Sequence, residues 1–326
     1  TSQEATTWLL YGQVFDALHE ASPQKENELL QEAVNGYIKT CSLAEPGTSP
    51  CSTAQRLQTG MCKRLTKQGN KMYTLGDFQR AIYWFEKAQL VNPVDTTALL
   101  YAGLAAQELG DYGQVAQHFS HLAEMGYPDK LIYETLIVYT KKYLQDNQQA
   151  LMWTQKAQQL FPNDPLIQRQ EISLLISLGQ SEQAKNRLMT LVQEEPEDEV
   201  LQFNLGFTHE QLGDMQSAAQ AYEKAVALSP EYFEPIYNLG ALYFNHAAEL
   251  FKTTKASNNN NYESKVAAKE EARKALQLAL PYLEKAAILR PHDSVIWHSL
   301  SIIYSRLGMS EKAEAASLKL EELQGD

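Results

Sequence analysis

The residue types that carry out chemistry are sparse in this chain, and few of them lie close together. His118 and His121 are three residues apart, a spacing that places both imidazoles on one helix face and can chelate a metal ion. The competing interpretation is that both decorate a helix whose core face is Val115, Phe119 and Leu122. Neither a cysteine nor a carboxylate cluster completes a metal site nearby, so the sequence favours the second interpretation.

A run of acidic residues at 194–199 has the carboxylate density of a calcium loop. It lacks the alternating ligand order and the turn glycine of such loops. Because it lies where two helical units would meet, the sequence predicts a solvated turn there. The chain also contains no phosphate-binding loop, nucleophile elbow or zinc-protease motif. We therefore expect no enzyme activity, no catalytic residue, no metal site and no cofactor.

The three cysteines, Cys41, Cys51 and Cys62, are ten and eleven residues apart. They include no closely spaced pair of the kind that binds zinc, and three thiols are too few for a disulfide framework. Two states remain open, namely three thiols, or one bridge and one free thiol. In the second state, Cys41–Cys51 would close the Pro/Gly/Ser-rich stretch 45–52, which we expect to be a linker.

The composition excludes several classes of partner. The chain has 326 residues, of which 44% are hydrophobic, and its formal charge is −12. This charge opposes binding to a phosphate backbone or an anionic membrane surface, so no nucleic-acid partner is expected. No run approaches the roughly 20 apolar residues of a membrane span, and no membrane insertion is expected. The length exceeds a single core of about 250–300 residues, unless repeated units bury their faces against their neighbours.

A period of 34 residues runs through the chain, as the spacing from Pro162 to Pro196 and on to Pro230 shows. Small residues at fixed places let two helices approach closely, an aromatic residue fills the gap, Gly-Asp separates the helices, and proline ends the pair. Segment 199–232 contains every part of this pattern: Leu205-Gly206, Gly213-Asp214, Ala218, Tyr222, Ala225 and Pro230. The period therefore predicts antiparallel helical hairpins that are stable only when stacked.

This pattern resembles the tetratricopeptide repeat, and the resemblance covers nearly the whole chain. It implies an all-α fold, a right-handed superhelical stack of antiparallel helical hairpins (an α-solenoid) that spans 1–326 as a single superhelix. The expected parts are a degenerate N-terminal helical hairpin at 5–50, five copies in 62–232, a copy with an insertion at 233–293, and a last copy with a capping helix at 294–326.

The insertion, at about 247–273, is expected to be an elongated hairpin. Its flanks are rich in helix formers, and its asparagine-rich stretch 257–261 is typical of a loop tip. A second irregularity is an expanded loop expected near 20–27. The stretch 252–274 contains six Lys or Arg against three Glu, which makes it locally positive on an acidic chain.

The resemblance also implies a binding groove on the concave side, lined by residues 2, 5, 9 and 12 of each first helix. Asn204 and Asn238 follow such positions, and in some family members an Asn there hydrogen-bonds the main chain of a bound peptide. The competing interpretation is that some of these residues pack against second helices of neighbouring copies. The remainder would form an exposed apolar strip, and such strips usually mark interaction sites. The candidate groove residues are Tyr73, Leu100, Leu104, Arg169, Phe203, Asn204, Phe207, Tyr237, Asn238 and Phe244.

The expected function is therefore that of a non-catalytic scaffold that binds a peptide or protein segment in the concave groove. The alternatives are a regulatory or auxiliary subunit of an enzyme complex and a self-assembling structural element. Segments 237–243 and 280–286, with the long insertion between them, resemble secreted tetratricopeptide proteins of Bacteroidetes. This resemblance favours the cell envelope or periplasm over the cytoplasm.

Overall fold

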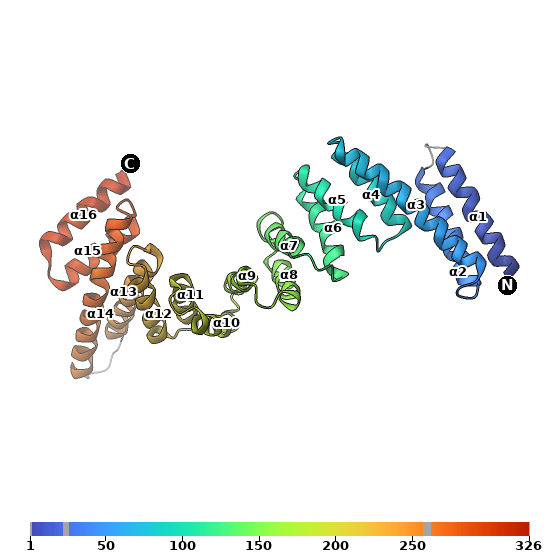
Figure 1. The fold of residues 1–326 in the computed structure, drawn as a ribbon. Helices are drawn as coiled ribbons and strands as arrows, with labels where there is room; N and C mark the ends of the chain where they lie inside the picture. The colour runs from blue at the N-terminus through green and yellow to red at the C-terminus, as the bar shows by residue number, and fades with distance from the viewer. Residues whose placement is uncertain (1, 22–25, 257–261, 326) are drawn as a thin grey trace. The chain divides into compact units, whose positions relative to one another are not determined.

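A computed structural model describes residues 2–21, 26–256 and 262–325 (Figure 1). Within these ranges the regular structure is entirely helical, so the predicted all-α class is confirmed. The expanded loop expected near 20–27 lies largely outside the described residues, and the tip at 257–261 lies wholly outside them. The helices are α1 (Ser2–Ala21), α2 (Glu26–Leu43), α3 (Ser49–Thr74), α4 (Phe78–Val91), α5 (Thr96–Glu108), α6 (Tyr112–Glu124), α7 (Lys130–Lys142), α8 (Asn147–Leu160), α9 (Pro165–Ser177), α10 (Ser181–Glu194), α11 (Glu199–Gln211), α12 (Met215–Leu228), α13 (Phe233–Ala256), α14 (Tyr262–Leu289), α15 (Ser294–Leu307) and α16 (Ser310–Gly325).

The chain divides into two compact units, Thr1–Leu174 and Leu175–Asp326, and α9 runs across the division. In the first unit, α1 pairs with α2, α3 with α4, α5 with α6 and α7 with α8. In the second unit, α11 pairs with α12, α13 with α14 and α15 with α16. Consecutive pairs also touch, as where α4 meets α5 and α12 meets α13. Burial in each unit therefore comes from stacked neighbours, as in other repeat proteins.

Glycine and aspartate separate the helices of a pair. Gly213 ends α11 with a φ of 78°, a left-handed conformation that glycine adopts without steric cost. The next residue, Asp214, begins α12, because its Oδ1 accepts a hydrogen bond from the backbone N–H of Ser217 at 3.1 Å. Such an N-cap is typically worth about 1 kcal/mol. Part of the chain's acidity thus serves to begin helices, since Asp77, Asp95, Asp111, Asp129, Asp146, Asp198, Asp214 and Asp293 all occupy N-caps.

A glycine on the first helix closes several pairs against a large side chain of the second. A Cβ added at Gly206 would lie 2.5 Å from Cδ1 of the buried Tyr222 ring, so only glycine permits this approach. Gly240 meets Leu283 in the same way, with the added Cβ 2.7 Å from Cγ. Equivalent contacts join Gly12 to Tyr37, Gly69 to Phe85 and Gly103 to Phe119. The predicted combination of a small residue and a gap-filling side chain is confirmed.

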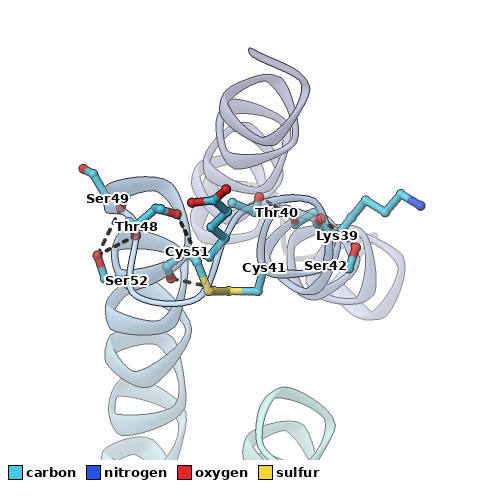
Figure 2. Close-up of a disulfide and its surroundings, with 10 residues drawn as sticks. Lys39, Thr40, Cys41, Ser42, Thr48, Ser49, Cys51 and Ser52 are labelled. Atoms are coloured by element: carbon cyan, nitrogen blue, oxygen red, sulfur yellow. Dashed lines mark hydrogen bonds between the residues drawn. A yellow bond between two sulfur atoms is a disulfide. The ribbon is translucent and has the colours of Figure 1, made fainter. Parts of the chain in front are cut away.

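The stretch 45–52, predicted to be a linker, is only partly one. Helix α3 begins at Ser49, with Pro50 in its first turn. Backbone N–H groups in the first turn have no acceptor within the helix, so proline, which has no N–H, is tolerated there. Cys41 near the end of α2 and Cys51 in the first turn of α3 form a disulfide across this corner (Figure 2). Cys62 is a buried free thiol. Of the two cysteine states left open by the sequence, the structure contains the one with a single bridge.

The last two pairs include the longest hairpin of the second unit. α13 has 24 residues and α14 has 28, whereas α11 has 13 and α12 has 14. Both helices of this hairpin are therefore longer than those of the preceding pair. None of the helices in the described ranges combines the length and the apolarity that crossing a membrane requires.

Candidate binding surface

Six of the predicted groove residues lie on two adjacent first helices of the second unit. Phe203, Asn204 and Phe207 belong to α11, and Tyr237, Asn238 and Phe244 belong to α13, which contacts α11. We call this set the α11–α13 face. On each helix the rings have aromatic neighbours: the centroid of Phe203 lies 6.5 Å from that of Phe207 on α11, and Tyr237 stacks on Phe233 at 5.6 Å on α13.

The aromatic residues of the α11–α13 face are half-buried. Phe203 and Phe207 pack against a buried cluster formed by Ala218, Ala219, Tyr222, Leu239 and Leu242. Tyr237 and Phe244 pack against the neighbouring cluster, which extends into α14 and α15. One side of each ring therefore packs against the core, and the other side is exposed to solvent. The α11–α13 face is thus less exposed than the apolar strip that the sequence predicts.

The two asparagines of this face differ in their surroundings. Nδ2 of Asn238 donates to Oη of Tyr222 at 3.4 Å, and this Oη donates to Oε2 of Glu210 at 2.7 Å. Burial, together with the Glu210 carboxylate, raises the pKa of Tyr222 far above its ordinary value. Asn238 thus belongs to a network that joins α11, α12 and α13. The side chain of Asn204 is half-buried and makes no hydrogen bond to any residue that the structure describes.

The remaining predicted groove residues lie outside this face. Tyr73 on α3 and Leu100 and Leu104 on α5 are half-buried on adjacent helices of the first unit. The Tyr73 ring meets that of Tyr101 edge-on at 5.7 Å. Arg169 is a half-buried residue of α9, the helix that runs across the division between the units. The predicted set thus comprises the residues of α11 and α13 in the second unit, those of α3 and α5 in the first unit, and Arg169 on the part of α9 that belongs to the first unit.

The structure corrects the interpretation of His118, which is not a surface decoration of its helix. The residue is 2% exposed, and Nε2 lies 4.0 Å from Oε1 of Glu86 on α4 without a hydrogen bond to any described residue. Burial lowers the pKa of His118 to about 4, and the nearby His121 adds to this effect. The face of α6 that packs in the first unit is therefore wider than the predicted Val115, Phe119 and Leu122.

The acidic run 194–199 and Cys62, the other residues considered for chemistry, both contribute to the fold. The acidic run 194–199 is the turn between α10 and α11, and Asp198 accepts from the backbone N–H of Leu201 at 2.7 Å to begin α11. The thiol of Cys62 donates to Oδ2 of Asp95 at 3.0 Å, and burial raises the pKa of Cys62 to about 12. Within the described ranges, no three His, Cys, Asp or Glu side chains are grouped so that they could hold a metal ion.

A pocket of about 310 Å³, which the sequence did not predict, opens in the second unit beside the α11–α13 face. Of the predicted residues, only Phe244 belongs to it. The sequence signal that would have found it is the apolar spacing i, i+4, i+7 that continues along α13 past the last packing position. The pocket is lined by Phe244, Ala248, Phe251 and Lys252 of α13, Leu276 of α14, and Ile302 and Arg306 of α15.

Comparison with known proteins supports the repeat and the fold. The family model described as a tetratricopeptide (TPR) repeat matches residues 211–246, which run from the end of α11 into α13. The C-terminal part of a TPR repeat-containing protein from Cytophaga hutchinsonii is 15% identical, with a TM-score of 0.51, and the match covers 79% of this chain and 95% of that one. At this identity the likeness shows the fold alone. No curated protein matches the chain.

Two further solved structures match with lower TM-scores. A TPR repeats protein from Bacteroides fragilis is 17% identical with a TM-score of 0.37, and the match covers 75% of this chain and 98% of that one. YrrB, described as a TPR protein with an unusual peptide-binding site, is 18% identical with a TM-score of 0.42, and the match covers 64% of this chain and 98% of that one. The stacked hairpins, the recurring glycine contacts and the matched repeat agree with one another. Residues 211–246 match a tetratricopeptide repeat, and the chain has the fold of tetratricopeptide-repeat proteins, a fold that supports protein–protein interaction.

Proposed function

We propose that this chain is a non-catalytic scaffold that binds a peptide or protein segment on the α11–α13 face. The observation that carries the proposal is Asn204, whose amide has no partner among the described residues and lies between Phe203 and Phe207 on the same helix. A primary amide has both donors and acceptors, so it can pair with the main chain of an extended peptide without requiring a particular sequence. Adjacent aromatic rings can contact the side chains of that peptide.

The rings on this face suit recognition because they are already held in place. Phe203 lies 5.9 Å from the fixed Tyr222 ring and 5.5 Å from Tyr232, so little rotamer freedom is lost when a partner covers it. Truncation of a well-placed aromatic anchor in an interface commonly costs about 2 kcal/mol of binding free energy, which corresponds to roughly 30-fold in affinity.

The test compares capture of host proteins by the intact chain and by single variants, with mass spectrometry to identify what is retained. Asn204→Ala changes the amide without removing a packed ring, and Phe207→Ala removes one half-buried ring. Both are expected to lose the same retained protein. Fluorescence anisotropy with peptides from that protein then gives the affinity change, which we expect to be at least tenfold for each variant.

A matched control is needed because Phe207 also packs against the core. Tyr243→Ala removes another half-buried ring of α13, one that stacks on Tyr282 at 6.4 Å and donates to Glu223 at 3.1 Å. It should lose a similar amount of stability and still capture the partner. If all the variants retain the same proteins as the intact chain, the α11–α13 face is not the binding site.

An exposed apolar stripe on α1 favours self-assembly as a second candidate function. Leu10, Val14 and Leu18 are 57%, 55% and 42% exposed, and their spacing of four residues places them on one side of the helix. The buried residues of α1 include Gly12 and Asp16, which lie on the opposite side. Light scattering of the intact chain and of Val14→Glu tests this function. It is excluded if both are monomers at concentrations of about 100 μM.

A further inference from the structure

The pocket between α13, α14 and α15 has the size and lining of a side-chain receptor. Its volume of about 310 Å³ is at the lower end of the range of roughly 300–1,000 Å³ found for ligand sites. Phe244 and Phe251 line it from α13, Leu276 from α14 and Ile302 from α15. A pocket of this kind has room for one or two apolar side chains of a bound segment.

Two cations, Arg306 and Lys252, line the pocket, and the carboxylates of the described residues offset little of their charge. The guanidinium carbon of Arg306 lies 4.9 Å from the centroid of the Phe251 ring, and no carboxylate in the described ranges forms an ion pair with it. Among the residues that the structure describes, the ion-pair partner of Lys252 is Glu249, at 3.5 Å on the same helix. Because both of these side chains are largely exposed, the pair contributes little.

The helix that supplies the pocket's Leu276 extends this positive charge. Lys265, Lys269 and Arg273 recur every four residues along α14 and therefore share one side of the helix. None of the three forms an ion pair with a residue that the structure describes. The chain as a whole has a formal charge of −12, but this group of cations makes its own surface locally positive. That surface therefore attracts negatively charged groups.

We propose that this pocket binds an internal peptide segment in which a bulky apolar side chain is flanked on both sides by Asp or Glu. The apolar side chain occupies the pocket, and the flanking carboxylates pair with Arg306 and Lys252. These two cations come from different helices, α15 and α13, so a segment with a carboxylate on each side of its apolar side chain can pair with both. The proposal rests on the proposed function and specifies the chemistry of the segment that the scaffold holds.

The probe is a labelled hexapeptide, acetylated and amidated, with a central Leu-Phe and two Glu on each side. Its binding to the full chain is measured by fluorescence anisotropy at low salt. Three related peptides are compared with it: one with Lys in place of Glu, one with Ala in place of Leu and Phe, and one with Gln in place of Glu and a free terminal carboxylate. Each is expected to bind at least tenfold more weakly than the probe.

The variants assign the binding to the pocket. The double variant Arg306→Gln/Lys252→Gln is expected to weaken the probe's affinity at least tenfold. Lys67→Gln/Lys224→Gln, which removes two exposed cations, one from α3 and one from α12, serves as the charge-matched control and should leave the affinity unchanged. Circular dichroism shows whether each variant keeps its helical content.

Three results would overturn the inference: no binding of the probe to the intact chain, equal affinity for the double variant, or equal affinity for any of the three related peptides. Asn204→Ala separates this inference from the proposed function. If partner capture depends on Asn204 and the probe does not bind, only the pocket assignment is wrong. If the probe binds through Arg306 while partner capture is independent of Asn204, the pocket is a binding site and the proposal for the α11–α13 face is wrong.

Discussion

Gly206→Ala tests whether the glycine contact holds each helical pair together. The added Cβ would lie 2.5 Å from Cδ1 of Tyr222, a separation that requires the ring or a helix to move. The ring cannot swing aside freely, because it is fully buried and its Oη is bonded to Glu210 and Asn238. Overpacking of this kind costs about 1–3 kcal/mol. The better helix propensity of alanine offsets up to about 1 kcal/mol. Because a Cβ contact of 2.5 Å requires a shift, the upper part of the overpacking range, about 2–3 kcal/mol, applies. The expected net loss is therefore about 1–2 kcal/mol.

Hydrogen–deuterium exchange of the full chain, read by mass spectrometry, reports this loss where it occurs. A destabilisation of about 1–2 kcal/mol corresponds to roughly 5–30-fold faster exchange wherever the amides exchange through opening of the pair. We expect this acceleration in α11 and α12 and not in α3 to α6 of the first unit. Adding Tyr222→Leu to Gly206→Ala should recover part of the protection, because a smaller side chain relieves the contact.

Gly60→Ala is the matched control. Gly60 lies inside α3, and a Cβ added there would meet nothing within 4 Å. This substitution should slow exchange in α3, since alanine stabilises a helix interior by about 0.5–1 kcal/mol relative to glycine. The reasoning is refuted if Gly206→Ala leaves exchange in α11 and α12 unchanged or slower, because the glycine would then not be required by the contact.

Three further predictions concern stability. Because the pKa of His118 falls from an ordinary 6.5 to about 4 in the fold, the unfolded chain binds a proton first, and stability should fall by up to about 3 kcal/mol as the pH drops from 6.5 towards 4. His118→Leu should remove this part of the pH dependence of Tm, and an unchanged dependence would contradict it. Reduction of the Cys41–Cys51 disulfide frees a short loop and should lower the stability by roughly 2–3 kcal/mol. This loss should be seen as faster hydrogen exchange in α1 and α2 after mild reduction. Unchanged exchange would mean that packing holds the corner between α2 and α3. Tyr222→Phe leaves Glu210 without its donor and should cost about 1–2 kcal/mol in the α11–α12 pair, whereas wild-type exchange there would show that the bond is not stabilising.

The architecture could be predicted because a short set of residues defines each helical pair. Gly206, the Gly-Asp turn and Tyr222 all lie within 34 residues, so their spacing reports the local structure directly. The start of α3 could not be predicted in this way. Pro50 was interpreted as part of a linker, although proline is equally compatible with the first turn of a helix. The choice between a linker and a first helical turn at Pro50 depends on the tertiary contact between α2 and α3.

The sequence could predict which helices carry the candidate groove residues, but not how far those residues are buried. The repeat register places Phe203 on the first helix, yet its exposure depends on Leu239 and Leu242 of the next pair. Similarly, no local pattern indicates that the amide of Asn238 meets Tyr222 or that His118 lies against Glu86. These contacts depend on the angle at which neighbouring pairs stack, which short sequence motifs do not encode.

The glycine contact has a consequence for how such a chain can lengthen. Gly206 and Tyr222 are sixteen residues apart, as are the partners in the pairs Gly69–Phe85 and Gly103–Phe119. Both sides of the contact therefore lie within one segment of the coding sequence, and a single duplication would copy them together. Gly240 and Leu283 keep the same contact across 43 residues, because the additional 27 extend the far end of the hairpin. New sequence can thus be acquired at hairpin tips without altering the inherited contact that stacks the repeat.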